Sequence, residues 1–519
     1  MKSQTKELWC QTHDREEIQA RQLRKLRHFL KHRVMPFSDF YRRNFAETGI
    51  TPHDIRSWHD LSLLPFTEKS DLLPNPRDFV LIPRPSDLRK QPSTIWRALV
   101  HGKRRVAADF EREFRPLLMT STTGRSSQPL PFLYTAHDLD NLTIAGRRIM
   151  EVGGTQVDWR HANLFPFAPH LAFWQAHYAS LGFGAFMVGT GGGKTLGTAG
   201  NISLIDKVKP EVLIAVPTFL YHLLSQAVSE GHHWPHLQKL VLGGEKVPNG
   251  MRRKLRALCA ELGAGRVDVV ATYAFTEAKM AWIECPTPPG DEPSGYHLYP
   301  DLGIIEVIDP DSGKPVAPGQ PGEIVFTSLD SRGTVVIRYR TGDRVDGGLT
   351  WDACQYCGRR CPRLVGNISR VSEFRRVDVA KLKGTLVDFN ALEHALDDVE
   401  GIGAWQIELR KHNDDPFESD EIVIHAATER SGRHHDLEQT VARRFLEVTE
   451  LRPNRFEWHS REELSDRQGV GRALKEEKIV DHRPVPEAVP RRPESSAMAG
   501  KTKQAEKFFA DEASPALLI

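Results

Sequence analysis

The sequence predicts an α/β fold, in which a large N-terminal domain of α/β sheets with a β-rich part precedes a small α+β domain. From residue 117 to about 310, short apolar runs such as VLIAVP alternate with amphipathic segments such as TFLYHLLSQAVSE, the pattern of strands joined by helices. In residues 303–350, β-rich runs are separated by glycine and proline turns. After about residue 372, two strand-like runs, a helical run and a further strand-like run indicate the small α+β domain.

These changes in composition place the domain boundaries. We expect an N-terminal domain over residues 1–371, with its β-rich part at about 303–371, and a small C-terminal domain over residues 372–485. Residues 486–519 are rich in proline, alanine, glutamate and lysine, which is typical of a disordered tail.

Two N-terminal segments stand apart from the alternating pattern. Residues 17–48 predict a basic amphipathic helix interrupted at the Pro-Phe pair of HRVMPFSDF, with its Arg and Lys run as the solvated face of a helix packed on a core. Residues 76–115 are rich in proline and arginine and predict an irregular insertion or long loop.

Bulk properties narrow the range of partners. The chain has 519 residues, of which 39% are hydrophobic and 27% charged, the profile of a soluble globular protein. A formal net charge of +2 argues against nucleic acid or a membrane surface as a main partner. The charged N-terminal residues contain no apolar signal core, and no apolar stretch reaches transmembrane length, so we expect a cytoplasmic protein. The oligomeric state stays open, with a homodimer as one alternative.

Two glycine-containing motifs are candidates for nucleotide binding. The loop MTSTTGRSSQPLPF, residues 119–132, combines hydroxyls, a glycine and a cation, the groups that bind a polyphosphate. In VLGGEKVP, Gly243 and Gly244 follow an apolar strand and precede Glu245, so the backbone there can approach a flat ligand closely. Taken alone, each motif is more typical of a surface turn.

Two further motifs add a tyrosine and carboxylates. In VVATYAFTEAK, Tyr273 could stack on a base, while Thr276 and Glu277 could hold phosphate and magnesium, since Mg²⁺ prefers carboxylate oxygen beside substrate phosphates. In IRYRTGDRVDGG, Asp343 follows a β-rich run and suits the two hydroxyls of a ribose. A capped strand end and an ordinary turn are the alternatives.

The order of the four motifs is more specific than any one of them. TSTTG, GGE, YAFTE and YRTGD, in this order, resemble the adenylate-forming superfamily, which includes acyl-CoA synthetases, luciferases and peptide-synthetase adenylation domains. VMPFSDFYRR, LSLLPFTEKSDLL, the GGE element and CQYCGRRCPRL further resemble the phenylacetate–CoA ligase group. The resemblance covers about residues 20–485, with 76–115 unmatched.

The resemblance implies a role for each matching position. The ATP phosphates would be held by the loop, and the adenine would lie against the second and third motifs. Thr276 would contact the α-phosphate, Glu277 the magnesium and Asp343 the ribose hydroxyls. Arg370 would reach the ribose or a phosphate. The implied nucleotide-binding positions are Thr120, Ser121, Thr122, Thr123, Gly124, Arg125, Gly243, Gly244, Glu245, Thr272, Tyr273, Asp343 and Arg370.

The resemblance also implies a lysine from a mobile C-terminal domain that reaches the reacting phosphate. In GVGRALKEEKIVDHRP the matching position is Lys475, with Lys478 and Arg472 as rivals. The chain departs from the family pattern at three places. Ser121 stands where a glycine is usual, Arg125 replaces a lysine, and Ser372 occupies the hinge position of the usual Gly-Arg-x-Asp-Asp.

The clustered cysteines predict a metal site. Cys354 and Cys357 form a Cys-x2-Cys knuckle, a common half-site for structural zinc, and clustering in a chain without an export signal favours metal over disulfides. Cys285, His297 and Cys361 are candidates for the other half. We choose Cys285, His297, Cys354 and Cys357, with reduced buried cysteines as the alternative.

An aromatic segment is the candidate wall of the acid-binding pocket. The resemblance would place residues 163–184 along that wall, and an aromatic or medium-sized acid suits its side chains. Ordinary core packing is the alternative for at least half of them. The candidates are Phe165, Phe167, His170, Phe173 and Trp174.

Together these observations predict an AMP-forming acid–thiol ligase. It would use ATP and magnesium to convert an organic acid into an acyl-adenylate and pass the acyl group to CoA. Alternative acceptors are an amine or a carrier-protein thiol. The departures at Ser121, Arg125 and Ser372 leave a third reading, a non-catalytic nucleotide-binding relative.

Overall fold

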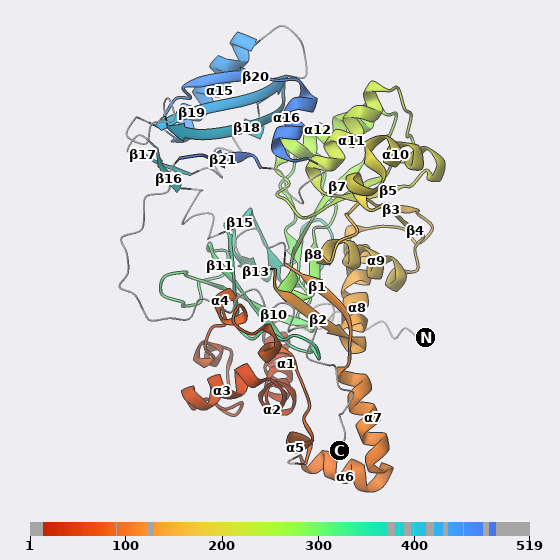
Figure 1. Ribbon diagram of the computed structural model, residues 1–519, viewed down its shortest axis with the longest axis vertical. Helices are drawn as coiled ribbons and strands as arrows, with labels where there is room; N and C mark the ends of the chain where they lie inside the picture. Colours follow the sequence, from red (N-terminus) through yellow and green to blue (C-terminus); the bar gives the residue numbers. More distant parts are fainter. Residues whose placement is uncertain are drawn as a thin grey trace, which may run out of the picture.

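The molecule has a central sheet. A helical N-terminal part lies at one end of it, and a separate sheet lies at the other end (Figure 1). The computed structural model describes residues 14–89, 91–122, 129–370, 379–382, 385–388, 396–397, 399–411, 420–428, 434–449, 451–470 and 477–483. The predicted α/β class is confirmed. In this described part of the chain, no helix is both long enough and apolar enough to cross a membrane.

The largest sheet has nine strands in the order β13-β14-β9-β8-β7-β6-β5-β3-β4. Strands β3 to β7 are mutually parallel, and β8, β9, β14 and β13 continue the sheet in antiparallel pairing. The strands are β3 (His161–Asn163), β4 (Met187–Gly189), β5 (Val212–Ala215), β6 (Lys239–Leu242), β7 (Asp268–Phe275), β8 (Met280–Ile283), β9 (Tyr296–His297), β13 (Leu349–Thr350) and β14 (Arg363–Leu364).

Helices alternate with the parallel strands, which confirms the pattern expected for residues 117 to about 310. Because these strands are covered by helices, they read as continuous apolar runs, and all of β5 is buried. The helices are α8 (Ala136–Gly153), α9 (Leu171–Phe183), α10 (Gly192–Val208), α11 (Pro217–Ser229) and α12 (Asn249–Glu261). The carboxyl ends of β5, β6 and β7 therefore meet at one edge of the sheet, where Gly243, Gly244 and the YAFTE motif lie.

The β-rich region forms an antiparallel sheet in the order β10-β11-β12-β15. Its strands are β10 (Gly303–Ile308), β11 (Gly322–Ser328), β12 (Tyr339–Val345) and β15 (Ile368–Arg370). Not every strand between residues 303 and 371 joins it, because β13 and β14 pair with β9 of the large sheet. A separate hairpin of β1 (Pro116–Ser121) and β2 (Pro131–Thr135) flanks the hydroxyl-rich loop.

The N-terminal part is helical and shares a hydrophobic core with the β-rich sheet. The helix expected from residue 17 is present and buries Ile18, Leu26 and Phe29, and a short helix containing Pro36 marks the predicted break. The elements are α1 (Arg15–Phe29), the π-helical η2 (Leu30–Val34), α2 (Met35–Phe37), α3 (Asp39–Thr48), η3 (Trp58–Leu63), α4 (Lys69–Leu72) and η4 (Pro76–Phe79).

The prediction of an irregular segment at 76–115 was wrong. The segment contains α5 (Pro85–Leu88), α6 (Pro92–His101) and α7 (Lys103–Phe114), and α6 and α7 project from the body (Figure 1). The prolines that suggested irregularity begin the helices, since proline is tolerated in the first turn, where its missing N–H has no partner to lose. Val106, Phe110 and Phe114 attach α7 to the core.

The described part of residues 396–483 has a hydrophobic core of its own, between a sheet of order β20-β19-β18-β21 and its helices. The predicted strands β18 (Ile402–Lys411), β19 (Asp420–Thr428) and β20 (Arg455–Trp458) and the predicted helix α15 (His434–Thr449) are confirmed, and α16 (Arg461–Gln468) and β21 (Ile479–Asp481) add to them. A two-stranded sheet of β16 (Val379–Leu382) and β17 (Thr385–Asp388) precedes it. Below, this part is called the C-terminal unit.

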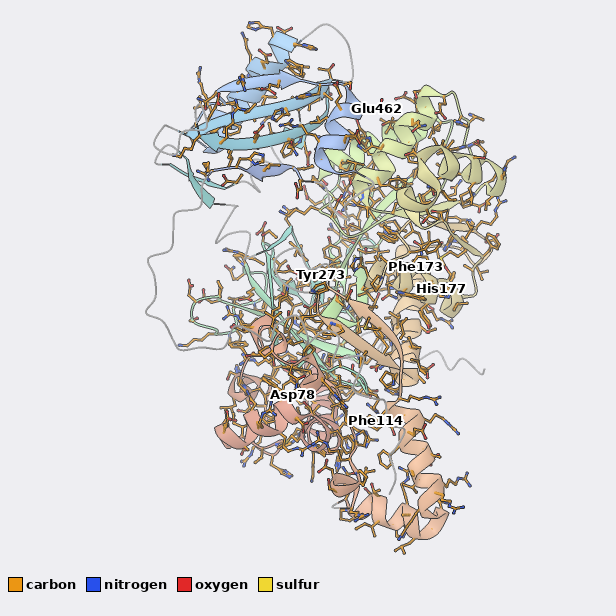
Figure 2. All side chains as sticks on the ribbon, in the orientation of Figure 1. Asp78, Phe114, Phe173, His177, Tyr273 and Glu462 are labelled. Carbon is orange, nitrogen blue, oxygen red and sulfur yellow. The ribbon has the colours of Figure 1, made fainter. Side chains whose placement is uncertain are left out.

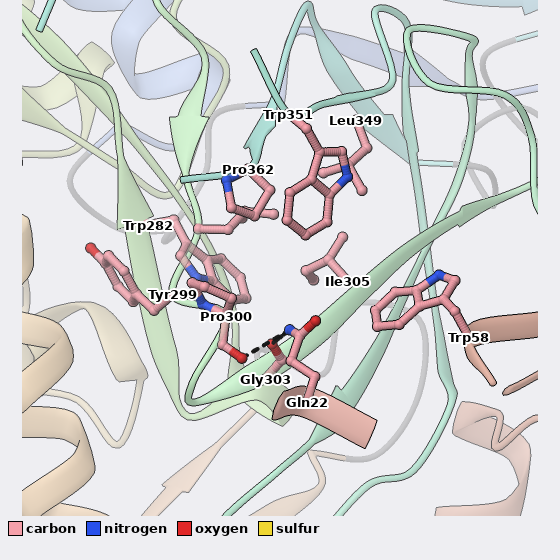
Figure 3. A pocket seen from close by; sticks show the side chains of 11 residues that line it. Gln22, Trp58, Trp282, Tyr299, Pro300, Gly303, Ile305, Leu349, Trp351 and Pro362 are labelled. Carbon is pink, nitrogen blue, oxygen red and sulfur yellow. Dashed lines mark hydrogen bonds between the residues drawn. The ribbon is translucent and has the colours of Figure 1, made fainter. Parts of the chain in front are cut away.

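A small pocket between α1 and β10 shows how the N-terminal helices attach to the β-rich sheet (Figure 3). The Gln22 amide nitrogen donates hydrogen bonds to the carbonyls of Pro300, at 2.8 Å, and Gly303, at 3.2 Å. Trp58, Trp282 and Trp351 line the same pocket. None of the residues that line it belongs to the four nucleotide-binding motifs, so we assign it to packing.

Candidate functional site

Gly243 and Gly244 directly follow β6, and each position requires glycine for a different reason. A Cβ atom on Gly243 would lie 2.4 Å from Oγ1 of Thr272 on the neighbouring β7, a distance that real structures do not tolerate. Gly244 has φ of +86°, which favours glycine. Glu245 follows and accepts a 2.8 Å hydrogen bond from the Thr218 hydroxyl. The second motif therefore lies directly beside the third.

A hydrogen bond joins the third motif to the fourth. The Tyr273 hydroxyl on β7 donates to Oδ2 of Asp343 on β12, at 2.8 Å. Both side chains are buried, and the Tyr273 ring stacks on Trp282 with a centroid distance of 5.9 Å. Figure 2 shows Tyr273 near the middle of the molecule, where the two large sheets meet. Asp343 is also opposite Arg370 in the pairing of β12 with β15. The structure describes the backbone of Arg370 alone.

Glu277 lies in the 3-10 turn η5 (Thr276–Ala278), directly after β7. Its Oε1 accepts a 2.8 Å hydrogen bond from the Tyr339 hydroxyl. Lys279, two residues later, forms a buried ion pair with Asp138 of α8, at 2.8 Å. The sequence analysis missed Tyr339 and Lys279. Tyr339 was visible as the first residue of the YRTGD motif, but only the fold brings it to Glu277.

The described ends of the hydroxyl-rich loop lie next to the aromatic segment. Ser121 donates its backbone N–H to the Pro169 carbonyl, and Nδ1 of His170 lies 3.1 Å from the Ser121 carbonyl oxygen. Thr120 is fully buried with its hydroxyl 3.2 Å from that of Tyr134, and Thr122 closes the loop through hydrogen bonds with Leu130. Thr123, Gly124 and Arg125 lie outside the described residues.

The aromatic segment packs along α9 and the glycine-rich turn before α10. The Phe167 and Phe173 rings meet edge to face at 4.9 Å, and Phe173 also contacts Trp174 at 5.4 Å. Phe167 is 57% exposed, whereas Phe165 is buried and lies 3.5 Å from the position of a Cβ on Gly243. Figure 2 shows Phe173 beside His177 on α9. The wall therefore reaches the end of β6.

The four residues chosen as metal ligands, two from the Cys-x2-Cys motif and two from earlier segments, come together at one point. Sγ of Cys285 lies 3.6 Å from Sγ of Cys354, and Sγ of Cys357 lies 3.2 Å from Nε2 of His297. All four ligand atoms lie within 4.8 Å of one another. A tetrahedral ion with metal–sulfur distances of about 2.3 Å has sulfur–sulfur edges of about 3.8 Å, so the dimensions fit zinc. Among the described residues, Cys361 is not part of this group.

Hydrogen bonds within this group change the pKa values of its cysteines and of its histidine. A hydrogen bond with Cys285 is the main cause that lowers the pKa of the Cys357 thiol; burial opposes it and His297 supports it. Although burial lowers the pKa of His297, hydrogen bonds to Cys354 and Cys357 raise it to about 9. The hydrogen bond with Cys357, followed by burial, raises the pKa of the Cys285 thiol, so the negative charge lies on Cys354 and Cys357, and the thiolate is the form of cysteine that binds metal ions.

Of the three basic candidates in the C-terminal unit, the structure describes one. Nζ of Lys478 lies 3.0 Å from Oδ1 of Asp397 and 4.8 Å from the centroid of the Trp405 ring, so it is held within its own unit. Lys475 and Arg472 lie outside the described residues. In this arrangement Lys478 is a structural residue of the C-terminal unit.

The C-terminal unit contacts α11 and α12 (Figure 1). Arg461 of α16 donates a hydrogen bond to the Tyr221 hydroxyl, and Oγ of Ser465 lies 3.0 Å from Nε2 of His222. Nζ of Lys254 donates to the Ile402 carbonyl at 2.6 Å. Burial, followed by the charge of Arg461, lowers the pKa of His222 to about 4. These contacts are polar, as expected between units that can separate.

Sequence comparisons agree with this arrangement. Residues 138–330 match the model of the AMP-binding enzyme family. Phenylacetate–coenzyme A ligase of Aromatoleum evansii is 28% identical over 334 residues, which cover 63% of this chain and 66% of that protein, so the chain spans slightly under two thirds of its length. The ligase of the same name from Thermus thermophilus is 25% identical over 469 residues, covering 85% of this chain and 94% of that one.

Structural comparison confirms the fold. The crystal structure of 2-hydroxyisobutyryl-CoA ligase in the postadenylation state, with R3-HIB-AMP, has a TM-score of 0.70 at 21% identity and covers 91% of each chain. The same ligase with 2-HIB-AMP and CoA in the thioesterification state has a TM-score of 0.58 at 20% identity, again covering 91% of each chain. The resemblance drawn from the four ordered motifs is confirmed by the comparisons.

Proposed function

Starting from its homology to the phenylacetate–coenzyme A ligases, we propose that this chain activates a carboxylic acid with ATP and transfers the acyl group to the thiol of coenzyme A. The observation that carries the proposal is the convergence of the second, third and fourth motifs at one edge of the large sheet. Gly243 touches Thr272, and Tyr273 bonds to Asp343. Chance would not bring three weak motifs to one place.

Each part of this edge has a task in the proposed reaction. Asp343, oriented by Tyr273, holds the ribose hydroxyls together with Arg370, while Gly243, Gly244 and the β7 backbone face the adenine. Thr276 and the loop of Thr120 to Arg125 hold the phosphates. Glu277, oriented by Tyr339, would hold Mg²⁺, which neutralises phosphate charge when bound. The aromatic wall from Phe165 to Trp174 takes the acid.

Two bond changes complete the reaction. First, a carboxylate oxygen attacks the α-phosphorus of ATP, and pyrophosphate leaves with the electron pair of the broken P–O bond. Lys475 and Arg125 would stabilise the charge that develops there. Second, the thiol sulfur attacks the acyl carbon, AMP leaves, and the thiol proton passes to solvent. Holding the reactants in line and neutralising charge supply most of the rate.

A structural zinc ion is the second part of the proposal. Cys285, His297, Cys354 and Cys357 would hold it in a closed tetrahedron without an open position for substrate. The group joins β8 and β9 to the segment between β13 and β14, so the ion would fasten the antiparallel end of the large sheet.

The decisive experiment is acid-dependent exchange of labelled pyrophosphate into ATP over a panel of aromatic and aliphatic acids. We expect exchange with at least one acid, and, on addition of CoA, a product with the mass of the acyl-CoA. If pyrophosphate exchange occurs but the acyl group passes to an amine or a carrier-protein thiol, that group and not CoA is the acceptor. Bound AMP without exchange for any acid would refute the enzyme and leave a nucleotide-binding relative.

A further inference from the structure

A second group of metal-binding side chains lies in the C-terminal unit, away from the cysteines. His425 is on β19 and Glu457 is its neighbour on the parallel strand β20, so both side chains emerge from the same face of the sheet. His459 follows β20. Nδ1 of His425 lies 3.0 Å from Nε2 of His459 and 3.3 Å from Oε2 of Glu457, and the last two atoms are 4.0 Å apart.

The other nitrogen of His425 is already committed to a carboxylate. Nε2 lies 2.7 Å from Oε2 of Glu408 on β18, and Nη2 of Arg467 lies 2.9 Å from the same oxygen and 3.1 Å from the ring nitrogen. A guanidinium only donates, so the carboxylate is the shared acceptor and Nε2 of His425 carries the proton. In the neutral ring this leaves the lone pair on Nδ1, aimed at His459 and Glu457.

This is the arrangement in which proteins present a histidine to a metal, with a carboxylate fixing the tautomer and the ring orientation from behind. Three lone-pair-bearing atoms then converge on one point. A proton between His425 and His459 would satisfy two of them and leave the Glu457 oxygen facing an electron pair. A cation satisfies all three. Tetrahedral ligands at about 2.0–2.2 Å from zinc lie about 3.4 Å apart, and the three observed distances bracket this value.

The neighbouring charged side chains determine which oxygen of Glu457 faces the histidines. The other carboxylate oxygen of Glu457, Oε1, pairs with Arg455 at 2.8 Å, so Oε2 is the one turned toward the histidines. The nearby His482 is 3.9 Å from Glu408 and is not part of the group. The side chain of His425 is 1% exposed, but those of His459 and Glu457 are 21% and 34% exposed, so the group opens to solvent on one side.

We propose that His425, Glu457 and His459 bind a divalent transition-metal ion of the Zn²⁺ type, with a water in the remaining position. Two imidazoles and a carboxylate suit zinc and its neighbours better than magnesium or calcium. His459 immediately precedes Ser460, the N-cap of α16, and α16 carries Arg461 and Ser465, which contact Tyr221 and His222. The ion would therefore fix the start of the helix that docks on α11. This inference does not depend on the proposed function.

The test is metal binding by the full chain after removal of bound metals, with Zn²⁺ for stoichiometry and Co²⁺ for the ligand type. We expect two ions per chain, one giving the near-ultraviolet absorption of thiolate-bound Co²⁺ and one without it. His459→Gln and Glu457→Gln should each lose the second ion and keep the thiolate absorption. His482→Gln, a neighbouring histidine outside the group, should keep both.

Substitution of Glu408, which orients His425, tests whether the group binds a metal ion or is held by hydrogen bonds alone. Glu408→Gln should weaken binding of the second ion roughly 10- to 100-fold, because the ring loses the carboxylate that orients it. Unfolding monitored by circular dichroism checks that each variant is folded. If the full chain binds the thiolate-bound ion alone, or if His459→Gln and Glu457→Gln bind Zn²⁺ with the stoichiometry and affinity of the parent chain, the inference is overturned.

Discussion

The Tyr273 hydroxyl donates a hydrogen bond to the Asp343 carboxylate across 70 positions of the chain, at 2.8 Å. The bond joins β7 of the large sheet to β12 of the antiparallel sheet, in the region where both are buried. Because it engages Oδ2, the carboxylate is held in one orientation. We infer that this contact sets the position of the proposed ribose-binding group.

Tyr273→Phe tests this relationship. Loss of the hydroxyl should release Asp343, and we expect KM for ATP in pyrophosphate exchange to rise roughly tenfold, about 1.4 kcal/mol, with a smaller change in kcat. Tyr296→Phe is the matched control, since its ring packs 5.7 Å from that of Tyr273. An unchanged KM for ATP in Tyr273→Phe would show that Asp343 is positioned without the tyrosine.

Substitutions of Glu277 and Tyr339 should reduce pyrophosphate exchange to different extents. We predict that Glu277→Gln reduces exchange by at least about 100-fold, because the proposed Mg²⁺ ligand loses its charge. Tyr339→Phe removes only the orienting hydrogen bond, so it should raise the Mg²⁺ concentration for half-maximal exchange while the maximal rate stays near that of the parent. Magnesium titration of the exchange rate measures both. Equal effects of the two substitutions would contradict the assignment of separate roles.

The two lysines near the end of the chain should differ. Lys475→Ala should abolish pyrophosphate exchange yet leave thioester formation from supplied acyl-adenylate. Lys478→Ala should keep exchange and instead destabilise the C-terminal unit by about 1–2 kcal/mol, because Asp397 loses its partner in a partly buried ion pair. Exchange assays and denaturant unfolding distinguish the two. If Lys478→Ala alone lost pyrophosphate exchange, Lys478 and not Lys475 would be the lysine that acts in adenylation.

Loss of the proposed zinc ion from the cysteine cluster should lower the stability of the protein. Cys357→Ser should lower the zinc content by about one ion per chain and lower the melting temperature, because the ion would join segments distant in sequence. Cys259→Ser is the control, since Cys259 is buried in another core and burial raises the pKa of its thiol to about 12. Elemental analysis with thermal unfolding provides the measurement, and unchanged zinc content in Cys357→Ser would refute the site.

The docking of the C-terminal unit should depend on pH through His222. Its pKa is about 4 when docked and 6.5 when solvated, so protonation favours separation. Docking should therefore be strongest above pH 6.5 and weaken as the pH falls toward 4. Hydrogen exchange of α11 and α16 at pH 7 and 5 measures this. His222→Gln should remove most of the difference, and an equal pH effect in this variant would assign it to another group.

The amino-acid sequence by itself determined the α/β class and the homology, because both depend on local patterns. Apolar runs of strand length alternating with amphipathic segments specify the parallel strands and their helices, as β5 and α11 show. The Cys-x2-Cys motif likewise indicated half of a metal site, and Cys285 and His297, chosen from other segments, lie beside it in the fold. The same local approach failed at residues 76–115, where prolines in first helical turns resembled the prolines of a loop.

Only the tertiary structure decided which residues support one another. Tyr273 with Asp343, Tyr339 with Glu277, and Lys279 with Asp138 are pairs separated by 70, 62 and 141 positions. No periodicity links residues so far apart, because each pairing results from how distant strands and helices pack on one another. For the same reason the group of His425, Glu457 and His459, with Glu408 behind it, had no signal in the sequence: parallel pairing of β19 with β20 creates it.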